Sequence, residues 1–375
     1  MKLEIWHNLA WSRYKGGVFT ALARLARERD AQVHVVQVAL TDKSRAALAE
    51  VALDRFDYPH EVLFPASYED IGRLRLYARV ARKAWRSDAD VTFVAGVDRP
   101  EYWVQAIVLA LRGRKRAVFF DSTRFDRPSR PIRRLAKRIF FRLVPWSLSY
   151  GERARDYAVS LGVRPERALV RPQAAYLPPD YDAGEVPDLR CQHAKEAGPT
   201  FLFVGRLSPE KQVDVLICAF ARYRAKVPQA RLRIVGAGPD SAKLRTLSDR
   251  LRVEDAVTFA GPEQDEALRA EYLRATALVL PSQSEPWGLV VNEALHHGCP
   301  VIVTERCGCV PELVAGSPCG IVVPSGDSEA LALAFEQAAD AFADRATIAR
   351  RCLETIAPFS PEAAARKILE AAAKL

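Results

Sequence analysis

The amino-acid sequence predicts an α/β protein built from two parallel-sheet domains in series. Strand-like apolar runs alternate with longer amphipathic stretches along the whole chain. This alternation is typical of a parallel sheet that is covered by helices. A stretch rich in proline and glycine, from 172 to 199, separates two such sets. The length of 375 residues also suits two domains better than one.

The first half of the chain contains one set of expected strands, and helical patterns such as Val18–Arg27 fill most of the gaps. The expected strands of the first half are Leu3–Trp6, Val33–Ala39, His60–Phe64, Asp90–Ala95, Ala117–Asp121, Trp146–Tyr150 and Ala168–Arg171. Those of the second half are Thr200–Val204, Arg231–Val235, Val257–Ala260, Ala277–Leu280, Pro300–Thr304 and Gly320–Val323.

These patterns predict an N-terminal domain over 1–173, a connection over 174–199 and a C-terminal domain over 200–358. A last segment, 359–375, is expected to form a helix that packs back on the N-terminal domain. Ser360 is a good cap for it, and Pro361 suits its first turn. Because parallel sheets bind ligands at the carboxyl ends of their strands, we expect the site in a cleft between the domains.

The composition is that of an ordinary globular protein, with 49% hydrophobic and 27% charged residues. The formal net charge of +9 favours an anionic partner, namely a nucleotide or phosphorylated substrate, a nucleic acid or an anionic membrane, although many proteins are mildly basic. The N-terminus reads as a strand instead of a signal peptide, and the apolar stretch Tyr102–Leu111 is too short to span a bilayer. We therefore expect a cytoplasmic protein that can sit on the inner face of the membrane.

Metal binding is not expected. The seven cysteines are odd in number and lack zinc-site spacing, so free thiols in a reducing compartment are the simplest interpretation. Two Asp-x-Asp patterns, Asp88 to Asp90 and Asp180 to Asp182, precede a strand or fall in the expected connection, and we assign both to turns. No metal or other cofactor is predicted.

The first motif with chemical meaning follows an expected strand of the second half. Gly205 ends the strand, and the cations Arg206 and Lys211 come directly after it, five positions apart. A loop at a strand end can present both side chains to one diphosphate, which arginine binds as a planar fork and lysine as a point charge. Spacing alone is equally compatible with two ordinary surface cations.

Two further motifs follow later strands. Gly236 and Gly238 permit either close approach of the backbone to a ligand or a plain tight turn. A helix is expected near Gly288, so the amides of Gly288 and Leu289 can bind a phosphate. Glu285 precedes this helix, and Glu293 lies inside it after an apolar run, where a carboxylate needs partners such as two ribose hydroxyls. A helix cap with a surface glutamate is the alternative.

Together these elements resemble the family 4 retaining glycosyltransferases, which have the GT-B fold of two Rossmann-like parallel-sheet domains facing each other across a cleft. The resemblance rests on Glu285 and Glu293 with seven residues between them, and on three further motifs in the same order: Gly-Arg-Leu-x-Pro-Glu-Lys at 205–211, Gly-x-Gly-Pro at 236–239 and Gly-Cys-Pro-Val-Ile at 298–302. It covers the whole C-terminal domain. One departure is Gly-Cys-Val-Pro-Glu at 308–312, where many relatives have Gly-Gly-x-Pro-Glu.

The resemblance implies a role for each matching residue. Arg206 and Lys211 would bind the diphosphate of a nucleotide-sugar donor and stabilise the departing charge. Glu285 would contact the transferred sugar and Glu293 the ribose. The amides of Gly288 and Leu289 would bind the distal phosphate, and Gly205, Gly236 and Gly238 would shape the donor site. In this interpretation the cations and helix amides replace a divalent metal.

The N-terminal half matches more loosely. Gly16-Gly17, read as a loop between the first strand and a helix, resembles the family's glycine loop near the donor phosphates. The stretch from Phe120 to Pro128, together with that from Gly151 to Tyr157, resembles a subgroup of bacterial polysaccharide-assembly enzymes, which implies a saccharide or lipid-linked saccharide acceptor. His7, Asp121 and Arg124 are the candidates on the acceptor side. Many relatives have a histidine where this chain has Asp121, and a structural role for His7 is the alternative.

A basic amphipathic helix is expected over residues 127–142. Apolar side chains interleave with its cations at helical spacing. The cations are Arg127, Arg130, Arg133, Arg134, Lys137, Arg138 and Arg142. Docking on anionic lipid near a lipid-linked acceptor is one interpretation, and a helix that packs on the core with a solvated basic face is the other.

Two other functions remain open from sequence alone. A nucleotide-sugar epimerase or hydrolase would keep the fold, although the Glu285 and Glu293 element argues against it. A basic nucleic-acid-binding protein would use the charge, but no stacking surface or reading helix is evident. The sequence identifies neither the donor base, nor the sugar, nor the acceptor.

Overall fold

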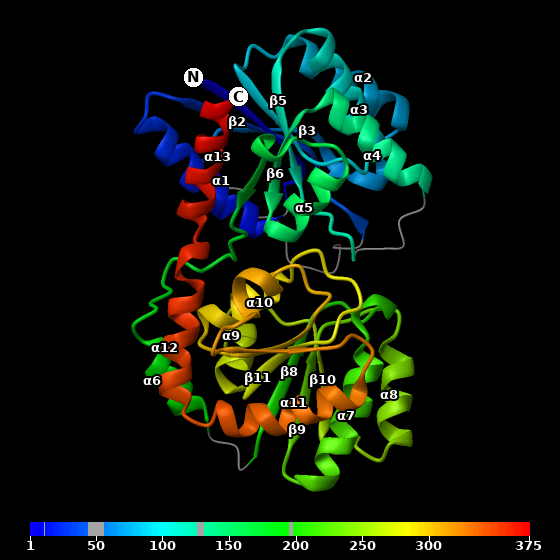
Figure 1. The fold of residues 1–375 in the computed structure, drawn as a ribbon, viewed down its shortest axis with the longest axis vertical. Helices are drawn as coiled ribbons and strands as arrows, with labels where there is room; N and C mark the ends of the chain where they lie inside the picture. The colour runs from blue at the N-terminus through cyan, green and yellow to red at the C-terminus, as the bar shows by residue number, and fades with distance from the viewer. Residues whose placement is uncertain (11, 44–55, 126–130, 195–197) are drawn as a thin grey trace. The chain divides into compact units, whose positions relative to one another are not determined.

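The computed structural model describes residues 1–10, 12–43, 56–125, 131–194 and 198–375, and these divide into two compact units. The N-terminal unit comprises Met1–Arg124, Pro128–Tyr176 and Phe359–Leu375. The C-terminal unit comprises Phe125–Arg127 and Leu177–Pro358. Figure 1 shows that each unit combines a sheet with helices, as the strand–helix alternation predicts.

The N-terminal unit contains a seven-stranded parallel sheet in the order β3-β2-β1-β4-β5-β6-β7. Its strands are β1 (Lys2–Leu9), β2 (Gln32–Thr41), β3 (His60–Ser67), β4 (Val91–Val94), β5 (Lys115–Phe120), β6 (Trp146–Tyr150) and β7 (Ala168–Arg171). Its helices are α1 (Arg13–Arg27), α2 (Arg73–Arg86), α3 (Pro100–Leu111), α4 (Pro131–Leu143), α5 (Glu152–Ser160) and α13 (Pro361–Lys374).

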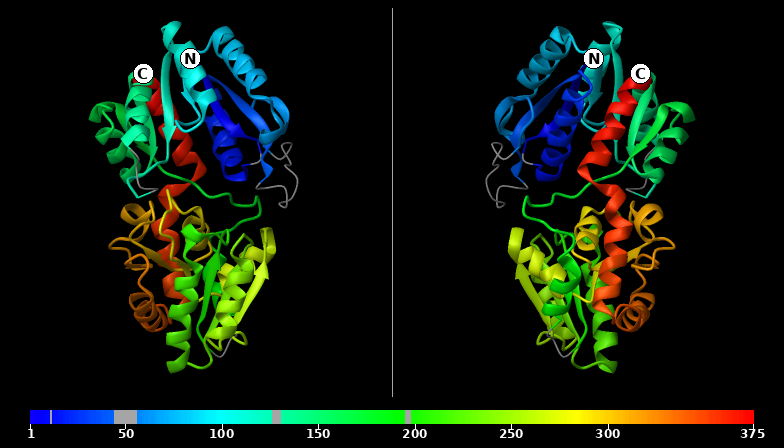
Figure 2. Two further views of the ribbon diagram at one scale, coloured as in Figure 1. Left: turned by 90° about the vertical axis from the view of Figure 1, so that its right-hand side faces the viewer. Right: turned by 90° about the vertical axis from the view of Figure 1, so that its left-hand side faces the viewer.

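Period-2 alternation of apolar side chains lets this sheet bury both of its faces. Leu3 and Ile5 of β1 pack into a core under α1 and α13, whereas Trp6 packs on the opposite face against α2. A third cluster joins β4 and β5 to α3, α4 and α5. Figure 2 shows α13 beside α1, although α13 begins 334 residues after α1 ends. The hydroxyl of Ser360 caps α13 by accepting from the amide of Ala363.

The C-terminal unit contains a six-stranded parallel sheet in the order β10-β9-β8-β11-β12-β13. Its strands are β8 (Thr200–Val204), β9 (Arg231–Val235), β10 (Val257–Gly261), β11 (Ala277–Leu280), β12 (Val301–Thr304) and β13 (Gly320–Val323). Its helices are α6 (Val186–His193), α7 (Val213–Lys226), α8 (Ser241–Arg250), α9 (Asp265–Arg274), α10 (Leu289–His296), α11 (Ser328–Ala341) and α12 (Arg345–Ile356).

The expected connection over 174–199 needs a correction, because α6 lies inside it and packs against α9 and α12. The fully buried guanidinium of Arg190 on α6 donates to the carbonyls of Tyr272, Leu273 and Ala275 at 2.7 to 2.9 Å. These carbonyls lie at the end of α9, where a helix has acceptors without intrahelical partners. The proline-rich composition did not indicate that this segment forms α6 and packs on the C-terminal unit through the long-range hydrogen bonds of Arg190.

Candidate functional site

The strand order of the C-terminal sheet defines where a ligand can bind. β8 is central, with β9 on one side and β11 on the other, so the chain winds in opposite directions from this point. Open α/β sheets bind ligands beyond the carboxyl ends of the strands at such a switch point. The motif at 205–211 follows β8, the pair Gly236 and Gly238 follows β9, and Glu285 follows β11. The fold therefore brings the three motifs of the C-terminal half to one edge.

Two glycines hold the loops after β8 and β9 in contact. The amide of Gly205 donates to the carbonyl of Val235 at 3.0 Å, and the amide of Leu207 donates to that of Ala237 at 3.0 Å. A Cβ atom on Gly236 would lie 1.9 Å from the carbonyl oxygen of Gly205, and one on Gly238 would lie 2.1 Å from that of Leu207. Both glycines are therefore needed for loop-to-loop packing, whatever they do for a ligand.

Lys211 and Glu285 form an ion pair at the centre of this edge. Their side chains are only 17% and 14% exposed, so the pair is shielded from bulk water. The amide of Gln283 donates to the carbonyl of Glu210 at 2.9 Å and fixes the two loops that carry them. A positioned ammonium group with a single carboxylate partner can stabilise negative charge on a ligand.

Arg206 is held differently from Lys211. Its side chain is 62% exposed, and one guanidinium nitrogen lies 3.3 Å from the carboxylate of Glu210 on the same loop. Within the described residues it forms no hydrogen bond with Glu285. Of the two cations predicted to bind a diphosphate, Lys211 is therefore held in place by its ion pair, whereas Arg206 lies on the surface.

The loop before α10 is built around a second backbone contact. Gly288 adopts φ of +99° as the residue that precedes the helix, and Leu289 is the first helical residue. The amide of Gly308 donates to the carbonyl of Glu285 at 2.9 Å, and a Cβ atom on Gly308 would lie 1.7 Å from the carbonyl oxygen of Pro286. This contact sets the position of Glu285 and of the first amides of α10.

The cysteines around Gly308 belong to this packing. Cys307 and Cys309 are both buried, and burial raises the pKa of the Cys307 thiol to about 12. In the described part of the chain, no group of three or more His, Cys, Asp or Glu side chains is arranged to hold a metal ion. The Asp-x-Asp residues lie outside helices and strands, where Asp88 pairs with Lys2 and Asp182 accepts from the amide of Gly184.

Glu293 lies apart from Glu285, on the body of α10. Its Oε2 accepts a hydrogen bond of 2.7 Å from the hydroxyl of Tyr272 on α9, and burial raises the pKa of this carboxyl group. The Tyr272 ring stacks on His297, with ring centroids 5.4 Å apart. Sequence reasoning missed Tyr272, because nothing local links a residue of α9 to one of α10.

The N-terminal candidates are not brought together. The first strand was expected to end at Trp6, but β1 continues to Leu9. The His7 ring is buried against Phe19, with its Nδ1 2.9 Å from the Leu9 carbonyl oxygen. This placement agrees with the structural role that was the alternative interpretation of His7. Asp121 follows β5 at the carboxyl edge of the sheet and is exposed, as is Arg124 three positions later.

Gly16 and Gly17 also lie elsewhere than expected. Both are inside α1, so the interpretation as a loop before the helix was wrong. The amide of Gly16 donates to the carbonyl of Ser12 at 3.0 Å, and a Cβ atom on Gly16 would lie 2.7 Å from the Phe56 ring. Gly16 is therefore a site of close packing on α1, whereas a Cβ atom on Gly17 would meet its nearest neighbour, Pro361, only at 3.9 Å.

Three residues that sequence reasoning did not select meet at the carboxyl edge of the N-terminal sheet. They are Lys15 on α1, Tyr150 at the end of β6 and Arg171 at the end of β7. A usable signal was present, since Tyr150 and Arg171 are the last residues of two correctly expected strands. The lysine directly before the glycine pair completed that signal.

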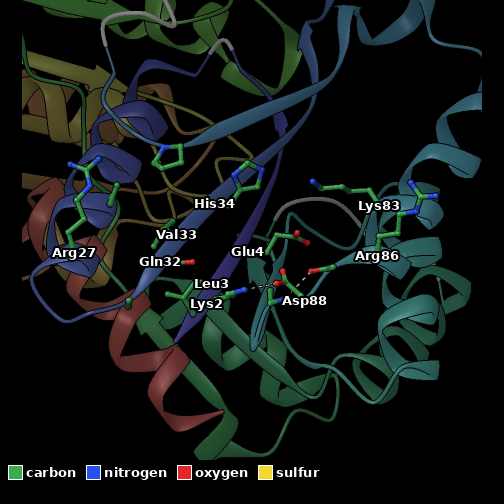
Figure 3. Close-up of a pocket in the computed structure, with 15 residues that line it drawn as sticks. Lys2, Leu3, Glu4, Arg27, Gln32, Val33, His34, Lys83, Arg86 and Asp88 are labelled. Atoms are coloured by element: carbon green, nitrogen blue, oxygen red, sulfur yellow. Dashed lines mark hydrogen bonds and ion pairs between the residues drawn. The ribbon is translucent and has the colours of Figure 1, made fainter.

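The cavity drawn in Figure 3 lies at the opposite, amino edge of the N-terminal sheet. It has a volume of about 490 Å³, and Lys2, Glu4, His34 and Lys83 are among the residues that line it. None of the predicted site residues contributes to it. Parallel α/β sheets bind ligands at their carboxyl edge, so we do not assign this cavity as the functional site.

Comparison with known proteins agrees with this geometry. The sequence profile of the family described as glycosyl transferases group 1 matches residues 187–350. The chain is 34% identical over 172 residues to D-inositol 3-phosphate glycosyltransferase of Corynebacterium aurimucosum, covering 44% of this chain and 41% of that protein. It is 33% identical over 179 residues to the GDP-mannose-dependent alpha-(1-6)-phosphatidylinositol monomannoside mannosyltransferase of Mycolicibacterium smegmatis, covering 44% and 47%.

A solved structure extends the similarity to the whole chain. HepE of Anabaena, crystallised with UDP, has a TM-score of 0.73 at 20% identity over 100% of both chains. Residues 187–350 are therefore a glycosyl transferases group 1 domain, and the chain has the GT-B fold with its two Rossmann-like sheets. The chain spans less than half the length of the two curated relatives described above.

Proposed function

We propose that this protein is a glycosyltransferase that moves a sugar from a nucleotide diphosphate donor to a saccharide or lipid-linked saccharide acceptor. The shielded Lys211–Glu285 pair at the switch point of the C-terminal sheet carries this proposal. It combines a fixed cation for a diphosphate with a carboxylate for sugar hydroxyls. The two curated relatives are named as glycosyltransferases, and HepE binds UDP, which supports a nucleotide-sugar donor.

A thermal-shift panel of UDP-, GDP-, ADP- and dTDP-sugars tests donor binding. The matching donor at a hundredfold excess over its Kd should stabilise the protein by about 2.7 kcal/mol. The variant Lys211→Ala should lose most of that stabilisation, while Lys226→Ala, an exposed cation of the same unit, should keep it. Failure of every donor to stabilise the wild-type protein would overturn the proposal.

Product analysis separates transfer from the alternative reactions. With the selected donor, a transferase releases little free sugar until an acceptor is added, whereas a hydrolase or an epimerase turns over without one. Rapid donor consumption with no dependence on any saccharide acceptor would therefore favour the alternatives over transfer.

We propose that transfer retains the anomeric configuration. Glu285 is engaged by Lys211, and Glu293 by Tyr272 on another element, so neither is arranged as the free nucleophile of a retaining glycosidase. In the proposed mechanism the acceptor oxygen approaches the face from which the diphosphate leaves. The leaving phosphate, steadied by Lys211 and Arg206, takes the proton of the acceptor hydroxyl. Proton NMR at early times should show an α-linked product from an α-linked donor, and a β-linked initial product would contradict retention.

We further propose that α4 docks on an anionic membrane. Among the described residues, no helix has the length and apolar composition needed to cross a bilayer. On α4, however, Ile132 is 81% exposed, and Leu135 and Ile139 are exposed beside it. The exposed cations of the same helix are Arg133, Arg134, Arg138 and Arg142. Exposed apolar side chains among cations suit the boundary between lipid headgroups and acyl chains.

Not every cation of the expected basic helix is suitable for testing this proposal. Lys137 points inward, since its ammonium group donates to Ser122 at 2.9 Å and lies over the Phe120 ring. Arg127 and Arg130 fall outside the described residues. Helix α3 packs beside α4 (Figure 1), and Leu111 at the end of α3 is exposed.

Replacing Arg133, Arg134, Arg138 and Arg142 with Gln should weaken binding to vesicles containing anionic lipid by about 1 kcal/mol per charge. The matched control replaces four exposed cations of the C-terminal unit, Lys243, Arg250, Arg350 and Arg351. Ile132→Ser with Leu135→Ser should weaken the same binding without a change in charge. Equal binding by the α4 variant and the control at low salt would reject the docking surface.

A further inference from the structure

Two buried cations of the N-terminal unit share one aromatic ring. Lys15 is 5% exposed and Arg171 is 1% exposed. The Lys15 ammonium lies 4.3 Å from the centre of the Tyr150 ring and is hydrogen-bonded to the Tyr150 hydroxyl. The Arg171 guanidinium lies 4.1 Å from the centre of the same ring. Tyr150 and Arg171 are ladder partners on β6 and β7, so the sheet itself fixes this grouping.

Neither cation has an acidic partner within salt-bridge distance in the part of the chain that the structure describes. The hydrogen bonds of Arg171 are long, at 3.4 Å to the Pro172 carbonyl and 3.4 Å to the side chain of Gln173, and its Nε is buried without a partner. Arg190 of the C-terminal unit is held by shorter hydrogen bonds, since its Nη1 donates to three carbonyls within 2.9 Å, although its Nε and Nη2 are also buried without a partner. Burying a charge without such partners is strongly unfavourable.

The groups around Lys15 do not supply enough negative charge to favour its protonated form. Burial and the positive charge of Arg171 lower the pKa of Lys15 well below its usual value, and Asp121 opposes this only in part. The remaining neighbours are the phenols of Tyr14 and Tyr150, whose pKa values burial raises, so both stay neutral. The ring of Phe119 completes the surroundings.

We propose that the carboxyl edge of the N-terminal sheet binds an anionic group, a phosphate or a carboxylate, between Lys15 and Arg171, and that this group belongs to the acceptor. The second half of the inference rests on the proposed glycosyl transfer, whereas the anion site stands on the geometry alone. Arginine offers a planar fork and lysine a point charge to the same oxyanion. The acceptor class is then a sugar acid or a sugar phosphate, and Lys15 and Arg171 are specificity-determining residues.

The test uses the full-length protein without donor and three probes in isothermal titration: inorganic phosphate, D-glucuronate and neutral D-glucose. We expect saturable binding of phosphate, of glucuronate or of both, and none of glucose. Preference between the two anions tells a phosphate acceptor from a carboxylate acceptor. Lys15→Met and Arg171→Met should each weaken the affinity for the anion roughly ten- to hundredfold, the range for a lost hydrogen bond to a charged group. Arg24→Gln, an exposed cation of the same helix α1, should bind like the wild type.

Stability and proton uptake distinguish this site from a structural one. Without an anion, Arg171→Met should melt at or above the wild-type temperature, because it replaces a buried charge that lacks an acidic partner with an apolar chain. Lys15→Met should do the same, because it removes a buried amine whose protonation burial already disfavours. Binding of glucuronate should take up protons near neutral pH, since an anion raises the lowered pKa of Lys15, and Lys15→Met should abolish this uptake.

Two results would overturn the proposal: no saturable binding of phosphate or glucuronate to the wild type, or unchanged binding in both methionine variants. Failure of the donor panel with an intact anion site would reject glycosyl transfer and leave the anion site in place. If the anion site binds but a neutral saccharide proves to be the acceptor with full turnover in Arg171→Met, the assignment of the group to the acceptor is wrong.

Discussion

At the carboxyl edge of the C-terminal sheet, Lys211 is paired with Glu285 and Arg206 with Glu210, whereas at the same edge of the N-terminal sheet Lys15 and Arg171 share only an aromatic ring. Both edges are the ligand-binding edges of parallel sheets. The difference lies in how each edge is compensated when no ligand is bound. The C-terminal edge neutralises its cations with its own acids, and the N-terminal edge leaves them to an external anion.

The two edges also differ in how far the sequence motifs reveal their residues. The C-terminal pairs involve residues of recognisable motifs, because a diphosphate is common to all donors of the class that the sequence resembles. The N-terminal group involves an isolated lysine, tyrosine and arginine that no motif connects. Four experiments test or sharpen the contrast.

The largest expected effect concerns the C-terminal cations. Lys211→Ala and Arg206→Ala should each reduce turnover by roughly 10²- to 10³-fold, the scale of losing one positioned stabiliser of developing charge. Steady-state kinetics with the selected donor measures this, with Lys226→Ala as the control. Near-wild-type turnover in both variants would contradict the assignment of these cations to the diphosphate, and an effect at Lys211 alone would show that only the shielded cation acts.

The second experiment concerns the glycine contact between the loops after β8 and β9. Gly236→Ala should lower the free energy of unfolding by about 3 kcal/mol, because the new methyl group would overlap the Gly205 carbonyl and φ is +132°. Urea unfolding measures the loss. Gly316→Ala is the control, since that glycine also has positive φ but has no neighbour within 4 Å of a new Cβ. Equal losses in the two variants would show that backbone strain matters and loop contact does not.

A smaller effect is expected at Tyr272. Tyr272→Phe should weaken donor binding by about 1 kcal/mol, or roughly fivefold, because the hydroxyl orients Glu293 and stabilises its ionised form. Burial already raises the pKa of Glu293, and loss of this hydrogen bond should raise it further. Donor affinity should therefore begin to fall at a higher pH in the variant than in the wild type as the solution is acidified. A pH series of donor Kd values that coincides for both proteins would place Glu293 outside the donor site.

The smallest effect is expected from chelation. We propose that turnover needs no divalent metal, because Lys211, Arg206 and the first amides of α10 supply positive charge for the diphosphate. Initial rates with and without EDTA should agree. A loss that magnesium or manganese restores would show that the cations of the C-terminal edge are insufficient by themselves.

The sequence by itself determined the strands, their parallel arrangement and the order of the C-terminal motifs. Trp146–Tyr150, Ala168–Arg171 and Thr200–Val204 were expected with the bounds that the structure gives them. The reason is that strand periodicity and helix caps, such as Ser360 on α13, are local properties of a few consecutive residues. The resemblance of residues 205–302 to a known family was readable for the same reason, since each motif is contiguous.

Only the tertiary structure decided which of these residues meet. Lys15 and Tyr150 are 135 positions apart, Lys211 and Glu285 are 74 apart, and Tyr272 and Glu293 come from different helices. His7 and the glycines 16 and 17 were misplaced because a strand that runs three residues further, and a helix that starts earlier, change which side chains face the core. Contacts of this kind depend on the packing of distant elements, which local periodicity does not encode. The charge balance of each sheet edge is therefore a property of the fold.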